Sequence, residues 1–180
     1  VKDVVDAAKA DAGKLAYAST GPGTIPHMSM LAFAKASGTK LKHVPFKGSA
    51  DVVQAMLAGT IELLSDQPNL VNQYNLTPIA VMAANRLPGY PNVPTMKQEG
   101  YDLEFSIWNG MFAPKGTPEA VLVKLQAACK AAMADPAVVT ALDKQRQPIQ
   151  YMDRAAFGAF VKSEEGRAAE LIKDAGLAPK

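Results

Sequence analysis

The sequence predicts an α/β fold in which a parallel-rich sheet is flanked by helices. Short apolar segments of strand length alternate with segments of helical periodicity through the first 84 residues, a pattern typical of βαβ units. The strand segments are apolar throughout, as parallel strands are when both of their faces are buried. With 180 residues, 48% of them hydrophobic and 20% charged, the chain is large enough to bury a core.

The first 84 residues are expected to alternate helices and strands. Strands are predicted, in chain order, over residues 15–19, 41–46, 61–65 and 78–83. Helices are predicted over residues 2–11, 25–36, 50–58 and 68–74, the third of them capped by Ser49. Parallel neighbours need right-handed crossovers, so this order indicates a three-layer lobe.

The composition changes near residue 84 and again near residue 113. Residues 85–101 are rich in proline and glycine, and Thr95 with Gln98 forms a capping box that predicts a one-turn helix over 96–99. Residues 103–113 are predicted to form the longest strand of the chain, which could be a crossing segment. Three helices are then expected over 117–134, 135–146 and 153–175, capped by Thr117, Asp135 and Asp153.

Charge and cysteine content exclude several classes of function. A net charge of +2, from 19 basic and 17 acidic residues, argues against a nucleic-acid partner or a membrane surface. One cysteine cannot form an internal disulfide. The glycine spacing of a dinucleotide loop is broken at Pro26, no P-loop lysine follows, and no His, Cys or carboxylate cluster suits a metal. We therefore expect neither a cofactor nor a metal.

Residues 19–24, with the sequence STGPGT, are the first candidate binding loop. Ligands of open parallel sheets bind beyond the carboxyl ends of the strands, and this segment follows the first predicted strand. Gly21 and Gly23 allow a tight turn, while Ser19, Thr20 and Thr24 supply hydroxyl groups. The helix that follows presents free N–H groups, which suit a carboxylate or a phosphate. An ordinary strand-to-helix turn is an equally open interpretation.

Two more strand ends are expected at the same edge of the sheet. At residues 47–49, Lys47 offers a cation, Gly48 a close backbone approach and Ser49 a helix start. At residues 65–67, Asp66 can accept a hydrogen bond from an ammonium or hydroxyl group of a ligand, or else cap the next helix. A solvated lysine and a capping aspartate are the alternatives.

A catalytic interpretation rests on few residues. Ser19, His27 and Asp66 could form a nucleophilic arrangement, but the sequence has no G-x-S-x-G motif. Structural roles for His27 and His43 are favoured. We predict a binding module with no catalytic residue, and keep an α/β hydrolase-like enzyme using Ser19 and His27 as the alternative.

Four motifs occur in a fixed order along the chain. They are KLAYAS at 14–19 with Gly21, Gly23 and Thr24; HVPFKGS at 43–49; PNVPT at 91–95 with Glu99 and Gly100; and WNGMFAP at 108–114 with GTP at 116–118. In this order they resemble the motifs of the solute-binding receptors of tripartite tricarboxylate transporters, also called Bug-type receptors. The resemblance extends over most of residues 1–175.

The resemblance implies a bacterial periplasmic-binding-protein-like fold of two lobes that close on a small carboxylate. Such a receptor delivers its ligand to a membrane permease. Residues 1–104 would be the ligand-binding lobe, 105–150 a crossing strand and helices of an incomplete second lobe, and 151–180 a helix returning to the first. The implied ligand-binding residues are Ser19, Gly21, Gly23, Thr24, Lys47, Gly48, Ser49 and Asp66.

The chain departs from the family pattern in several respects. The expected N-terminal lobe is missing, Phe46 stands where tyrosine is commoner, and residues 66–77 form a shorter segment. Because the chain begins at Val1, we expect a mature, processed or truncated product. Residues 105–146 are expected to expose apolar surface and to self-associate. A truncated remnant without independent activity is a third alternative.

Overall fold

The computed structural model describes residues 1–145 and 147–174. The chain divides into two compact units. The first comprises Val1–Ile107 together with residues 168–174, and the second comprises the described residues of Trp108–Arg167. Among the described residues, no helix combines the length and the apolar content that a membrane crossing requires.

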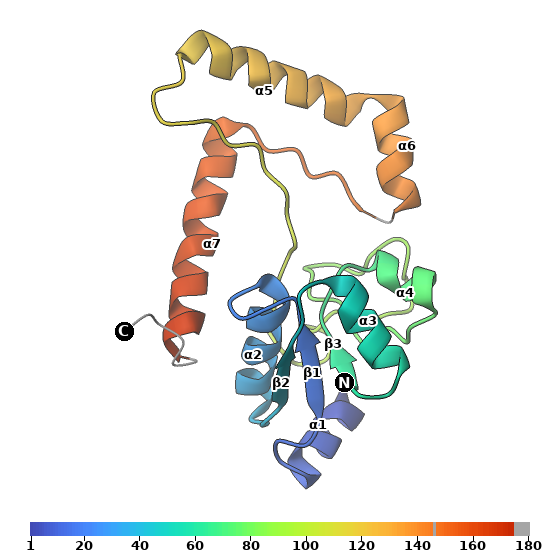
Figure 1. Cartoon of the computed structure of the whole chain (residues 1–180). Helices are drawn as coiled ribbons and strands as arrows, with labels where there is room; N and C mark the ends of the chain where they lie inside the picture. The colour runs from blue at the N-terminus through green and yellow to red at the C-terminus, as the bar shows by residue number, and fades with distance from the viewer. Residues whose placement is uncertain (146, 175–180) are drawn as a thin grey trace. The chain divides into compact units, whose positions relative to one another are not determined.

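A three-stranded parallel sheet lies at the centre of the first unit (Figure 1). Its strands are β1 (Ala16–Ser19), β2 (Lys42–Pro45) and β3 (Leu63–Leu64), in the order β2-β1-β3. Ala16 pairs with Lys42 on one side of β1, and Tyr17 pairs with Leu63 on the other. The predicted parallel sheet is confirmed, with β1 as its central strand.

Helices cover both faces of this sheet. The helices that lie wholly in the first unit are α1 (Lys2–Ala10), α2 (Ile25–Ser37), α3 (Ser49–Leu57) and α4 (Asn69–Tyr74). Side chains alternate across a strand, so Tyr17 packs with Met30 and Phe33 of α2 on one face. Ala18 packs with Val52 of α3 on the other face. The predicted three-layer arrangement is therefore confirmed.

The prediction of a fourth strand over residues 78–83 is wrong. Only Val81 forms an isolated bridge, with Thr95. The Val81 N–H donates to the Pro94 carbonyl at 2.9 Å, and its carbonyl accepts from the Met96 N–H at 2.9 Å. The segment thus pairs with a proline-containing turn, and proline has no N–H with which to continue a ladder.

The prediction of a long strand over residues 103–113 is also wrong. The Phe105 N–H donates to the Met82 carbonyl at 2.8 Å, but the segment has no strand assignment. An extended apolar segment becomes a strand only when another strand supplies its hydrogen bonds.

At residues 96–99 the structure forms hydrogen-bonded turns in place of the predicted one-turn helix. The capping box is confirmed, because Thr95 and Gln98 exchange two bonds of 3.1 Å.

Two predicted helix caps are wrong and two are confirmed. Gly48 is the N-cap of α3, and Pro118 is the N-cap of α5 (Glu119–Ala134) in place of Thr117. Asp135 caps α6 (Pro136–Lys144) through the Ala137 N–H at 2.8 Å. Asp153 accepts from the Ala156 N–H at 2.8 Å at the start of α7 (Arg154–Asp174). The predicted extensions to Arg146 and Ala175 lie outside the described residues.

An aromatic cluster holds the second unit together. The Phe157 ring packs against the rings of Trp108, Phe112 and Phe160, with centroids 5.6, 5.5 and 6.4 Å away. Such pairs stabilise a fold beyond the area they bury. Gly110 lies against this cluster, and a Cβ there would overlap Phe157 Cζ and come within 2.7 Å of its Cε1.

Gly110→Ala is therefore expected to lower the free energy of unfolding of the second unit by about 1–3 kcal/mol, because the Phe157 ring must leave its packed position. Unfolding in urea can be followed by the fluorescence of Trp108, the single tryptophan of the chain. The control is Gly166→Ala in α7, where a Cβ meets nothing within 4 Å and helix propensity should raise stability slightly. Equal midpoints for Gly110→Ala and the unmutated chain would contradict the prediction.

Candidate functional site

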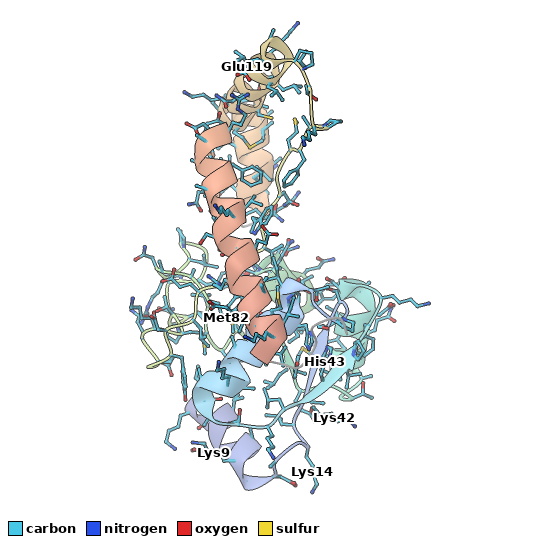
Figure 2. All side chains as sticks on the ribbon, turned by 90° about the vertical axis from the view of Figure 1, so that its left-hand side faces the viewer. Lys9, Lys14, Lys42, His43, Met82 and Glu119 are labelled. Carbon is cyan, nitrogen blue, oxygen red and sulfur yellow. The ribbon has the colours of Figure 1, made fainter. Side chains whose placement is uncertain are left out.

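A hollow of about 260 Å³ lies beyond the carboxyl ends of the three strands of the first unit. Seven residues line it: Thr20, Ile25, Pro26, Ser49, Asp66, Gln67 and Ile107. All three predicted strand ends contribute, so their expected convergence at one edge of the sheet is confirmed. Lys14 and Lys42 stand at the amino ends of β1 and β2, and Figure 2 shows them at one end of this unit together with Lys9.

The first strand end forms a loop organised around Gly21. The Gly21 N–H donates to Ser19 Oγ at 3.1 Å, and its carbonyl accepts from Thr24 Oγ1 at 2.8 Å. Gly21 has a φ of 128° and Gly23 a φ of 77°, values that side-chain-bearing residues rarely adopt. The predicted need for glycine at both positions is confirmed.

The amino end of α2 is open toward a ligand. Thr24 is the N-cap residue, but its hydroxyl bonds to Gly21 and makes no cap bond to the helix. The Thr24 N–H donates to the Gly21 carbonyl and the Met28 N–H to the Thr24 carbonyl. Pro26 has no N–H, so the N–H groups of Ile25 and His27 are the ones that keep their hydrogen-bonding capacity. Thr20 lines the hollow and adds a hydroxyl that can donate. These groups favour a negatively charged ligand atom.

Ser49 and Asp66 join the second and third strand ends. Ser49 Oγ donates to Asp66 Oδ2 at 2.8 Å, and the Gln67 N–H donates to Asp66 Oδ1 at 2.8 Å. The alternative in which Asp66 caps α4 is not what the structure forms, because Pro68 is the N-cap and no side chain bonds there. Asp66 instead lines the hollow.

The other predicted residues do not line the hollow. Lys47 is exposed, and Gly48 caps α3 in an extended conformation with a φ of −171°. Gly21, Gly23 and Thr24 belong to the same loop as Thr20, but of these four residues Thr20 is the one that lines the hollow. Ser19 is buried, with 1% of its surface exposed.

Two stacked histidines support the loop. The rings of His27 and His43 lie 3.9 Å apart at an interplanar angle of 12°. His43 Nε2 lies 2.7 Å from Ser19 Oγ, and His27 Nδ1 accepts from the Gly23 N–H at 3.0 Å. The histidine that bonds Ser19 is thus His43, and the Ser19–His27 pair of the hydrolase-like alternative is not formed. Among the described residues no carboxylate bonds to His43, so a Ser-His-Asp arrangement is not formed there.

The contacts around Ser19 fix the position of one proton. Ser19 Oγ accepts from the Gly21 N–H and lies 3.1 Å from the Gly21 carbonyl, which can only accept. A hydroxyl has one proton and two lone pairs. All three contacts are satisfied together when Ser19 donates to the carbonyl and His43 Nε2–H donates to Ser19. When the His43 ring is uncharged, its proton is then on Nε2 and its lone pair is on Nδ1.

Burial keeps both histidines uncharged. Burial, followed by the nearby His43, lowers the pKa of His27 to about 4, and burial lowers the pKa of His43 as well. An unfolded histidine titrates near pH 6.5. Between pH 6.5 and about 4 the unfolded chain therefore binds more protons than the folded chain, so stability is full above this window and is lost as the pH falls through it.

We expect the free energy of unfolding of the first unit to fall by the order of 2 kcal/mol between pH 7 and pH 4.5 through His27 alone. Urea unfolding followed by far-ultraviolet circular dichroism measures it. In His27→Gln, an amide oxygen can still accept from the Gly23 N–H, but the group does not titrate, so the pH slope should flatten. An identical slope in the two proteins would contradict the assignment to His27.

Several lining residues were not among the predicted site residues. Ile25 and Pro26 belong to a helix start, where an apolar residue looks the same whether it faces a core or a ligand. Ile107 comes from a segment predicted to be a strand. Thr20 belongs to the predicted loop and its hydroxyl was expected to be able to donate, although it was not among the implied ligand-binding residues. Gln67 follows Asp66 directly, so adjacency was the one signal available for it.

Comparison with known proteins identifies relatives along the whole chain. A family model described as the tripartite tricarboxylate transporter family receptor, TctC, matches residues 1–177. The UPF0065 protein in the gbd 5' region of Cupriavidus necator is 31% identical over 99% of this chain. The chain spans 55% of the length of that relative.

Solved structures share the fold. The periplasmic binding protein BugD is 30% identical, with a TM-score of 0.86 over 100% of this chain and 62% of its own. Rpa4515 of R. palustris with adipate is 25% identical, with a TM-score of 0.89 over the same two shares. MatC of Rhodopseudomonas palustris with bound malate is 25% identical, with a TM-score of 0.82 over 96% of this chain and 61% of its own. By its match to the family model along almost its whole length, the chain belongs to the tripartite tricarboxylate transporter family receptors.

Proposed function

We propose that this chain is the ligand-binding part of an extracytoplasmic receptor that captures a small carboxylate. The observation that carries the proposal is the hollow where the open amino end of α2 and the Thr20 hydroxyl meet the Ser49–Asp66 pair. Open first-turn N–H groups attract anions. Two structural relatives hold adipate and malate, both of which are small carboxylates.

The ligand would be handed to the membrane permease of a tripartite transporter, and the receptor would work in the periplasm. Support comes from the family membership and from the description of BugD as a periplasmic binding protein. The role is binding without catalysis, and the buried position of Ser19 is consistent with a loop-supporting hydroxyl. Recovery of the full-length protein in the osmotic-shock fraction of its host would test the location.

A titration of the chain with small mono- and dicarboxylates tests the binding proposal. Backbone amide NMR spectra should shift at Thr20, Gln67 and the first turn of α2, in the millimolar range or below. Equimolar chloride and small primary amines are the controls. If no carboxylate shifts these amides at tens of millimolar, binding by this chain is rejected.

For the division of the chain, we propose residues 1–104 as the ligand-binding lobe. Residues 105–150 would belong to an incomplete second lobe, and residues 151–180 would return to the first. The length of the relatives supports this division, since the chain spans 61–62% of the solved structures.

We further propose that residues 105–146 self-associate. Met111, Phe112 and Val123 are 62%, 67% and 58% exposed, and no described residue of α5 or α6 is buried. Helices with so much apolar surface are normally covered. Light scattering should show dimers or larger species at micromolar concentrations, and Val123→Asp should shift the distribution toward monomers. A monodisperse monomer at every concentration would contradict this proposal.

A further inference from the structure

We propose that the hollow selects carboxylates that also carry a hydroxyl or ammonium group, and that it disfavours a second carboxylate at the Asp66 side. This inference rests on the proposed function and concerns the same hollow. It follows from an unequal distribution of hydrogen-bond donors and acceptors around the lining residues.

The side of the hollow formed by Ser49 and Asp66 presents acceptors. Ser49 has one hydroxyl proton, and it donates that proton to Asp66 Oδ2 at 2.8 Å. Ser49 Oγ can therefore only accept from a ligand. Asp66 accepts one bond at each carboxylate oxygen, from Ser49 and from the Gln67 N–H. Two carboxylate oxygens together accept about four bonds, so capacity remains for a donor on the ligand.

The side formed by the start of α2 presents donors. Thr20 contributes a hydroxyl, and the N-cap Thr24 leaves the first-turn N–H groups without a side-chain partner. Ile25, Pro26 and Ile107 give the remaining lining an apolar character. A ligand that matches both sides has a carboxylate for the donors, a hydroxyl or ammonium group for Asp66 and a small apolar part.

The charge of the lining residues favours the same kind of ligand. None of the described residues that line the hollow is cationic, and Asp66 is the acidic one among them. A second carboxylate beside Asp66 would bring two negative charges together without a lysine or arginine between them, and like charges in a partly enclosed site repel. A hydroxyl or an ammonium group in that place forms a hydrogen bond to a charged acceptor, one of the stronger kinds of hydrogen bond.

Matched ligands separate these cases. Lactate and alanine differ from propionate by one donor group, and succinate differs from propionate by a second carboxylate. NMR titrations of the chain should give dissociation constants for lactate and alanine about tenfold below that of propionate. Succinate should bind no more tightly than propionate. Equal affinities for lactate, alanine and propionate, or tighter binding of succinate, would overturn the inference.

Variants assign the effect to one carboxylate. Asp66→Asn keeps the shape of the side chain and can still bond Ser49, but it removes the charge. The tenfold preference should shrink to about twofold, and succinate should gain affinity relative to propionate. Asp51→Asn removes a charge from an exposed residue of α3 that does not line the hollow, and should leave every ratio unchanged.

Ser49→Ala provides a second variant. It removes the donor to Asp66 Oδ2 and leaves an acceptor site open, so the preference for lactate should persist or grow. Loss of the preference in Ser49→Ala with its retention in Asp66→Asn would overturn the inference. If no carboxylate shifts any amide, the proposed function fails, and this inference fails with it.

Discussion

Tyr17→Ala is expected to lower the free energy of unfolding of the first unit by about 3–5 kcal/mol. Tyr17 lies in the central strand β1 with 1% of its surface exposed, and it packs in the core with Val5, Met30 and Phe33. Its ring also stacks on His43 at a centroid distance of 5.0 Å. Truncation to alanine leaves a cavity and removes one member of the stack that supports the loop at residues 19–24.

Tyr17→Phe is the matched control and should behave in the opposite way. The Tyr17 hydroxyl is buried and has no hydrogen-bond partner among the described residues, and burial raises its pKa to about 12. Removing an unpaired buried hydroxyl should leave stability unchanged or raise it by up to about 1 kcal/mol. Urea unfolding followed by circular dichroism measures both variants. A loss in Tyr17→Phe as large as in Tyr17→Ala would show that the hydroxyl, and not the ring, is what matters.

Gly21→Ala is expected to weaken carboxylate binding at least about tenfold. Its φ of 128° lies in a region that L side chains rarely adopt, so an alanine would push the loop toward a different backbone conformation. The bonds from the Gly21 N–H to Ser19 Oγ and from Thr24 Oγ1 to the Gly21 carbonyl would be lost together. Thr20, which lines the hollow, would then move with its neighbour.

Gly13→Ala separates backbone strain from site damage. Gly13 has a φ of 84°, a Cβ there meets nothing within 4 Å, and the residue precedes β1 at its amino end. Both variants should lose about 1 kcal/mol of stability through the left-handed backbone. Gly13→Ala should keep its affinity for carboxylates within about twofold of the unmutated chain. Equal losses of affinity in the two variants would indicate that global strain, and not the loop, controls binding.

Local sequence signals predicted the elements whose hydrogen bonds are local or whose apolar pattern is unambiguous. The strands around Ala16 and Lys42, the helix after Thr24 and the capping box at Thr95 belong to this group. The positive φ values of Gly21 and Gly23 were predictable for the same reason, because residue type and position within a turn determine the backbone there. The convergence of the three strand ends at one edge of the sheet was predictable because the carboxyl ends of parallel strands lie at the same edge.

Features that depend on distant partners were not predictable. Residues 78–83 and 103–113 have strand-like composition, but whether such a segment pairs depends on a neighbour that its own sequence does not specify. Serine is a residue type typical of N-caps, yet the Ser49 hydroxyl bonds to Asp66, 17 residues later. The bond between Ser19 and His43 joins adjacent strands, and the order of residues along the chain does not show which side chains of two strands lie side by side.

The strand order of the first unit has a consequence for how this unit folds. β1 is synthesised first but occupies the middle of the sheet, between two strands that follow it in the chain. Both pairings are parallel, so no hairpin can form early and act as a local nucleus. Ala16 cannot pair until Lys42 has been synthesised, and Tyr17 cannot complete its pairing until Leu63 has been synthesised. The apolar central strand therefore leaves the ribosome unpaired, and we expect chaperone contact with it to end only once β3 has emerged.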